Sequence, residues 1–118
     1  MKVAAIASRF GLEALLVPSD ATLVTAGYTS DLLSDVMANA VADSVLITIQ
    51  AHKNTIAVAS LIGINAIIVC NNRAVPEDML ASAQTEGVAV FRTPMSQFEV
   101  SGLLYQELQK TGKASSPA

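Results

Sequence analysis

Apolar and polar positions along this chain alternate in two ways, which predict helices and strands in turn. Apolar residues at helical spacing indicate amphipathic helices, and short runs rich in β-branched residues indicate strands. The predicted helices cover residues 2–10, 30–40, 55–62, 76–86 and 93–109. The predicted strands cover residues 13–17, 22–26, 45–50, 66–70 and 88–91. From residue 44 onward, strand and helix follow each other at intervals that suit βαβ units.

This order of elements predicts one α/β domain with three layers. The sheet is expected to be mostly parallel, with four or five strands flanked by helices. The wholly apolar run 66–70 is typical of a central strand buried on both faces. The domain is expected to cover residues 1–110, and the small polar residues 111–118 are expected to form a disordered tail.

Polar residues mark the expected helix starts. Ser30 is a natural N-cap, and Asp31 follows in the first turn, where the helix dipole favours a negative charge. Thr93 precedes a proline and is predicted to cap the last helix, while Pro76 is expected as the first helical residue of the one before it. Gly27 is expected to end the strand 22–26.

Composition narrows the classes of function. The chain has 118 residues, of which 52% are hydrophobic and 14% charged, with a net charge of −3. It has no basic stripe, which disfavours binding to nucleic acid or to a membrane surface. The single cysteine, Cys70, has no metal-site spacing around it and cannot form an intramolecular disulfide. A cytoplasmic protein with no metal and no cofactor is therefore expected.

The loops that follow the parallel strands are expected to meet at one edge of the sheet, where ligands bind in such folds. The candidate ligand-binding residues gather in these loops, and each has a structural alternative such as capping or turn formation. His52 is the only histidine, and Asp31 or Asp35 would have to orient it if it acted as a general base. The candidates are Gly27, Ser30, Asp31, Gln50, His52, Asn54 and Thr93.

Motifs of the common catalytic classes are absent from the sequence. There is no phosphate-binding P-loop, no Gly-x-Gly-x-x-Gly, no Gly-x-Ser-x-Gly and no His-Glu-x-x-His. Kinases, dinucleotide enzymes, serine hydrolases and zinc proteases are therefore unsupported, and no catalytic residue is predicted.

Three stretches of the chain resemble the DRTGG domain family. They are residues 26–40, which read AGYTSDLLSDVMANA, residues 47–59, which contain ITIQAHKN and then IAVA, and residues 87–99, with GVAV, Thr93 and Phe98-Glu99. The likeness runs from about residue 2 to 108 and is to small stand-alone members similar to the N-terminal domain of HPr kinase. The name motif is degenerate, because Ala21-Thr22-Leu23 stands where members have Asp-Arg, and only Gly27 of the Gly-Gly pair is kept.

The resemblance implies a non-catalytic regulatory or ligand-sensing domain that forms a homodimer and binds a small anionic metabolite or nucleotide. One alternative is an accessory subunit of an iron-only hydrogenase or another electron-transfer complex, with no ligand of its own. A second is a phosphocarrier or an enzyme that uses His52.

Overall fold

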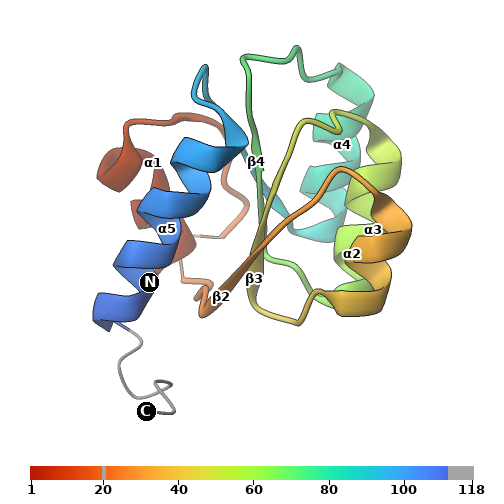
Figure 1. Cartoon of the computed structure of the whole chain (residues 1–118). Coiled ribbons are helices and arrows are strands. Elements are labelled where there is room, and N and C mark those ends of the chain that lie inside the picture. The colour runs from red at the N-terminus through yellow and green to blue at the C-terminus, as the bar shows by residue number, and fades with distance from the viewer. Residues whose placement is uncertain (20, 112–118) are drawn as a thin grey trace.

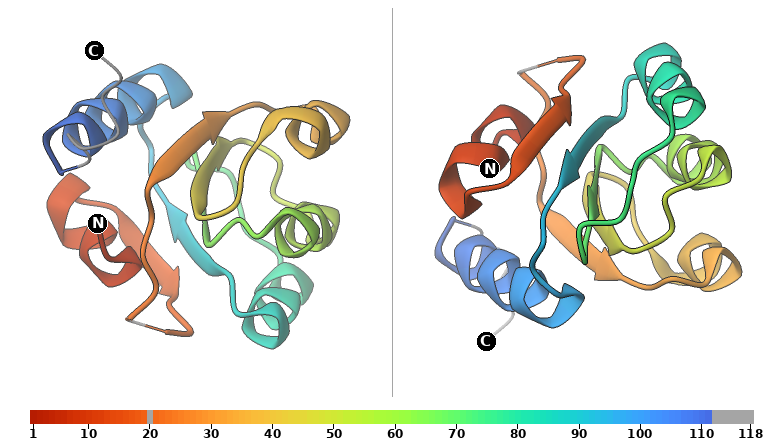
Figure 2. Two further views of the ribbon diagram at one scale, coloured as in Figure 1. Left: turned by 90° about the horizontal axis from the view of Figure 1, so that it is seen from below. Right: turned by 90° about the horizontal axis from the view of Figure 1, so that it is seen from above.

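The computed structural model describes residues 1–19 and 21–111 and forms three layers (Figure 1). The strands are β1 (Glu13–Leu16), β2 (Ala26–Thr29), β3 (Ser44–Thr48), β4 (Ala66–Val69) and β5 (Ala89–Arg92). The helices are α1 (Val3–Phe10), α2 (Leu33–Asn39), α3 (Lys53–Ile62), α4 (Glu77–Glu86) and α5 (Gln97–Thr111). The views from above and below place α1 and α5 on one face of the sheet and α2, α3 and α4 on the other (Figure 2).

The sheet has five strands in the order β1-β5-β4-β3-β2. The last four of these are parallel, and β1 pairs antiparallel with β5. The predicted three-layer α/β fold with a mostly parallel sheet is therefore confirmed.

Alternate residues of the central strands build two cores, one on each face of the sheet. In β3, Val45 and Ile47 pack with α1 and α5, whereas Leu46 packs against α2, α3 and α4. All residues of β3 and β4 are buried, as expected for parallel strands covered on both faces.

The predicted strand 22–26 is wrong, because the second strand begins where that segment was expected to end. Val24 lies against the N-terminus instead: its N–H donates to the Met1 carbonyl at 2.7 Å, and Lys2 bridges to Leu23. Strand β2 then pairs with β3 from Ala26 to Thr29. Gly27 consequently lies inside the strand rather than ending it.

Several helix starts also differ from the prediction. Helix α2 begins at Leu33, and Ser30 lies outside the N-cap position, which Leu32 occupies. Helix α4 has Pro76 as its N-cap rather than as its first helical residue.

Helix α5 begins three residues later than the predicted Thr93-Pro94 start would give. Its first turn carries a capping box: Ser96 Oγ accepts from the Glu99 N–H at 3.2 Å, and Glu99 Oε1 accepts from the Ser96 N–H at 3.0 Å. Thr111, the first residue of the predicted tail, is the last residue of α5. The rest of that tail, residues 112–118, lies outside the described residues.

Candidate functional site

The loops after the parallel strands meet at one edge of the sheet, as their topology requires. The loop after β4 donates two backbone hydrogen bonds to the loop after β5, from Asn71 to the Met95 carbonyl at 2.9 Å and from Asn72 to the Thr93 carbonyl at 2.8 Å. After β2, the Ser30 N–H donates to the Ile47 carbonyl at 3.2 Å. The loops after β4 and β5 thus lie next to each other, and the loop after β2 begins beside β3.

Asp31 is the centre of this edge. Its Oδ1 accepts hydrogen bonds from Thr48 Oγ1, the Ile49 N–H and Gln97 Nε2, each at 2.9 Å. These donors come from the end of β3 and from the start of α5, so one carboxylate oxygen joins three segments. The predicted place of Asp31 in the first turn of the helix is wrong, because α2 begins at Leu33; its structural role is to join these segments.

The stretch from Gln50 to Asn54 leads from β3 into α3 and is held by capping bonds. His52 is the N-cap of α3, and its Nδ1 accepts from the Asn54 N–H at 3.0 Å. The Gln50 carbonyl accepts from Thr55 Oγ1 at 2.8 Å. The residues Gln50, His52, Lys53 and Asn54 are exposed, so this loop offers polar side chains to solvent from a fixed backbone.

Ser30 and Thr93 use their hydroxyls in local turns. Ser30 Oγ accepts from the Leu32 N–H at 3.2 Å, and Thr93 Oγ1 accepts from the Met95 N–H at 3.2 Å. Thr93 is buried. Both geometries agree with the turn-forming alternative for these residues.

Asp35 pairs with a tyrosine of β2. Tyr28 Oη donates to Asp35 Oδ2 at 2.8 Å, and Asn39 Nδ2 donates to Oδ1 at 2.8 Å. The hydrogen bond from Tyr28 lowers the pKa of Asp35, and the same bond raises the pKa of Tyr28. Since Asp31 is bonded to Thr48, Ile49 and Gln97, both carboxylates proposed to orient His52 hydrogen-bond to other groups.

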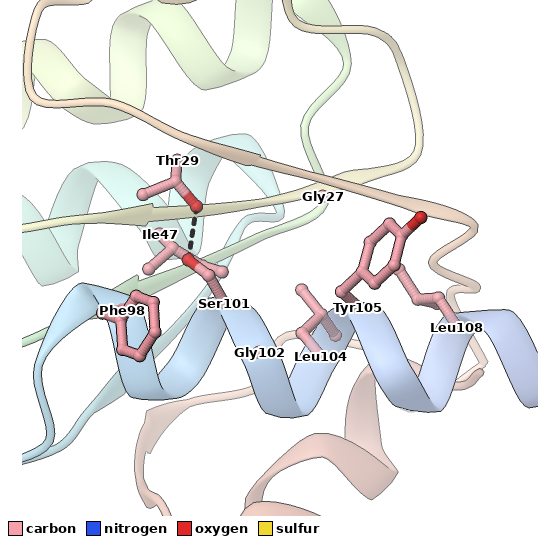
Figure 3. Close-up of a pocket in the computed structure, with 9 residues that line it drawn as sticks. All are labelled: Gly27, Thr29, Ile47, Phe98, Ser101, Gly102, Leu104, Tyr105 and Leu108. Carbon is pink, nitrogen blue, oxygen red and sulfur yellow. Dashed lines mark hydrogen bonds between the residues drawn. The ribbon is translucent and has the colours of Figure 1, made fainter.

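A groove of about 370 Å³ lies beside this edge, between β2 and α5 (Figure 3). Thr29 Oγ1 and Ser101 Oγ, one from each wall, form a hydrogen bond of 2.7 Å across it. The described residues that line it include no charged side chain; they are Gly27, Thr29, Ile47, Phe98, Ser101, Gly102, Leu104, Tyr105 and Leu108.

The sequence reasoning missed the α5 wall of this groove. Phe98 and Tyr105 are 87% and 68% exposed. In a chain whose aromatic content is only 4%, two aromatic residues seven positions apart on one helix were a usable signal. Among the candidates, only Gly27 lines this groove, while Asn54 lines a second depression of about 230 Å³ between α3 and α4.

Within residues 1–19 and 21–111, no cluster of three or more His, Cys, Asp or Glu side chains is placed to hold a metal ion. Over the same residues, no helix has the length and apolar character needed to cross a membrane. Cys70 is fully buried at the end of β4, and burial raises the pKa of its thiol to about 11.

Fold and site together define a small α/β domain. The loops at the carboxyl edge of its sheet are joined by hydrogen bonds to Asp31, and an apolar groove lies open between β2 and α5. The fold of this domain is similar to a crystal structure of the CBS and DRTGG domains of the regulatory region of Clostridium perfringens pyrophosphatase, complexed with the activator diadenosine tetraphosphate. The TM-score is 0.72 at 14% sequence identity, over 89% of this chain and 46% of that chain, so the chain spans about half the length of this neighbour. The likeness supports a DRTGG-like fold. No family model and no curated protein matches the sequence.

Proposed function

We propose that this chain is a non-catalytic regulatory domain of the DRTGG type, which binds a small anionic metabolite or nucleotide and assembles as a homodimer. The observation that carries the proposal is the exposed polar loop Gln50–Asn54 at the carboxyl edge of the sheet. Its backbone is fixed by capping bonds, and the side chains of Gln50, Lys53 and Asn54 are exposed, where they can meet a ligand.

Charge at this loop suits an anion. Lys53 is the first residue of α3 and supplies an ammonium group, and the start of a helix carries partial positive charge. Gln50 and Asn54 add amide donors and acceptors. The neighbouring depression between α3 and α4 is lined by Lys53 and Asn54 on its α3 side, where an anion would lie, and by Glu86 on its α4 side.

Two further observations support sensing rather than catalysis. His52 is engaged in capping, and Asp31 and Asp35 hydrogen-bond to groups other than His52, so the acid-base pair considered from the sequence lacks its central contact. The solved neighbour is a regulatory region in complex with a nucleotide activator.

The test is a thermal-shift screen followed by calorimetry, with ATP, AMP, diadenosine tetraphosphate, acetyl phosphate and coenzyme A as probes. We expect at least one probe to raise the melting temperature. The variants Gln50→Ala and Asn54→Ala should abolish the shift. The matched control is Gln106→Ala, which removes an exposed amide from α5, and it should leave the shift unchanged.

No response to any probe would contradict the proposal and favour the accessory-subunit alternative. In that case, recovery of an electron-transfer enzyme with the tagged chain from its own host would identify the docking partner. Incorporation of phosphate at His52, seen by intact mass after incubation with acetyl phosphate, would instead favour the phosphocarrier.

A further inference from the structure

Helices α1 and α5 cover one face of the sheet, but they leave part of that face open beside its last strand, β2. Gly27 and Thr29 line the groove beside α5 and are exposed although they belong to the sheet. β2 is the last strand of the sheet. The wall from Phe98 to Leu108 runs for roughly 15 Å along α5, since a helix rises about 1.5 Å per residue. The groove is therefore elongated, bounded by a helix on one side and a strand edge on the other (Figure 3).

Two large apolar side chains project from this wall. Phe98 is 87% exposed and Tyr105 is 68% exposed. Aromatic side chains can bury about 150–250 Å² each, so these two leave on the order of 250 Å² in water. That is about a third of the roughly 800 Å² that each partner buries in a standard interface. The rest of the groove lining lies beside these two side chains and adds to the area that a partner could bury.

Gly102 lies between the two aromatic residues on the same helix face, four positions after Phe98 and three before Tyr105. Glycine inside a helix costs about 1 kcal/mol relative to alanine. A Cβ at Gly102 would meet no atom of residues 1–19 or 21–111 within 4 Å, so packing among these residues does not account for this glycine. Gly27 is different, because a Cβ added at that position would lie 2.9 Å from Leu104 Cδ2. An unexplained glycine flanked by exposed rings suits the close approach of another backbone.

We propose that a second copy of this chain occupies the groove, with the two α5 helices crossing antiparallel at Gly102. The inference rests on the proposed homodimer and gives it an interface. Because Gly102 sits near the midpoint between Phe98 and Tyr105, a two-fold axis there brings Phe98 of each copy to Tyr105 of the other. Each copy thus supplies both the aromatic side chains and the groove that receives them, as an isologous contact requires.

The described residues of the lining carry no charge, which favours this occupant over the anion expected at the Gln50–Asn54 loop. Each copy has a net charge of −3, and an uncharged contact region lets two such copies meet without placing like charges face to face. The elongated groove has the shape to receive a helix. In the second copy, α5 is the helix that presents exposed apolar side chains, Phe98 and Tyr105.

The first experiment is sedimentation velocity over the micromolar range of protein concentration. Wild-type chain should form a dimer. Gly102→Leu should raise the dissociation constant at least about tenfold, because the new side chain blocks the crossing. A Cβ at this position meets no described atom within 4 Å, and leucine has a higher helix propensity than glycine, so the folded subunit should melt no lower.

Phe98→Ser should weaken the dimer in the same way by removing the exposed ring. The matched control is Leu61→Ser, which removes another highly exposed apolar side chain, 71% exposed, from α3 on the opposite face of the sheet. It should leave the dissociation constant within about twofold of wild type.

A cross-link tests the geometry directly. Gly102→Cys should give a dimer on a non-reducing gel after mild oxidation with copper-phenanthroline, since two thiols near a two-fold axis lie close together. Cys70 is buried and should not compete. Leu61→Cys is the control and should stay monomeric on the gel.

A wild-type chain that stays monomeric overturns the inference, as does a small aromatic probe that binds the groove of that monomer. A dimer that persists in both Gly102→Leu and Phe98→Ser also overturns it, but leaves the proposed homodimer intact with its interface elsewhere. Ligand sensing is scored separately, because the thermal-shift variants Gln50→Ala and Asn54→Ala lie outside the groove.

Discussion

The Asp31 carboxylate accepts a hydrogen bond of 2.9 Å from the Thr48 hydroxyl, which ties the loop after β2 to the end of β3. The same oxygen accepts from Gln97 at the start of α5. Thr48 is fully buried, and its hydroxyl also accepts from the Gln50 N–H at 3.0 Å. Asp31 therefore controls the position of the loop in which we place the ligand.

Replacing Asp31 should destabilise the fold. Hydrogen bonds to charged groups contribute about 1.5–3 kcal/mol each, and the loss leaves a buried hydroxyl without its acceptor. We expect Asp31→Ala to lower the free energy of unfolding by about 2–4 kcal/mol. Urea denaturation measures the change. Gln97→Ala, which removes one of the three donors, should cost about 1.5 kcal/mol. A loss below that of Gln97→Ala would contradict the role given to Asp31.

Asp31 also illustrates what sequence can predict about such a site. Its place after a strand, and therefore its place at the carboxyl edge of the sheet, followed from the alternation of elements. Its partners did not, because Thr48 and Gln97 lie 17 and 66 positions away and are brought together only by strand pairing and the docking of α5. The sequence thus placed these loops at the carboxyl edge of the sheet. It could not show which of their residues bond the loops together and which face solvent.

The shift of β2 has a similar cause. Residues 22–26 have suitable β propensity, but Val24 pairs with the N-terminus, and parallel pairing with β3 starts only at Ala26. Tertiary pairing outweighs local propensity here. At α5, in contrast, the Ser96 and Glu99 capping box was readable from the sequence and points to the observed start.

The two glycines of the groove should respond oppositely to alanine. Gly27→Ala places a Cβ 2.9 Å from Leu104 Cδ2, and Leu104 is 2% exposed. We expect it to lower the free energy of unfolding by about 1–2 kcal/mol, as overpacking does. Gly102→Ala should raise it by about 0.5–1 kcal/mol through helix propensity. Chemical denaturation at low protein concentration, where the single subunit dominates, measures both changes. The reverse order of stability would show that the close approach to α5 does not require Gly27.

The hydrogen bond between Tyr28 and Asp35 should make the stability of the fold depend on pH in the acidic range. The hydrogen bond from Tyr28 lowers the pKa of Asp35 in the folded chain. A lowered carboxyl pKa stabilises the fold above the ordinary value of about 4 and loses that effect as the pH falls through the folded value. Tyr28→Phe should therefore melt below wild type at neutral pH, and the difference should shrink in acid.

Melting curves recorded from neutral to acidic pH test this expectation. Tyr105→Phe, which removes a hydroxyl from an exposed ring of α5, is the control and should show no such trend. A constant difference between Tyr28→Phe and wild type at every pH would mean that the two groups are not linked.

Cys70 should be inert in the folded chain. Its side chain is fully buried, and burial raises the pKa of the thiol to about 11. Reaction requires the thiolate, which at pH 8 is then on the order of one part in a thousand. We expect Ellman's reagent to react at least about 100-fold more slowly with native chain than with chain in urea. Comparable rates would show that β4 opens to solvent.

His52 combines a cap with the exposed position expected of a ligand contact, and the two roles can be separated. Its Nδ1 accepts from the Asn54 N–H at 3.0 Å at the start of α3. Loss of an N-cap costs about 1 kcal/mol, so His52→Ala should lower the free energy of unfolding by that amount. His52→Asn supplies another capping oxygen and should stay near wild type. If the imidazole contacts the ligand, both variants should lose the ligand-induced rise in melting temperature; if His52 only caps α3, the response should survive in His52→Asn.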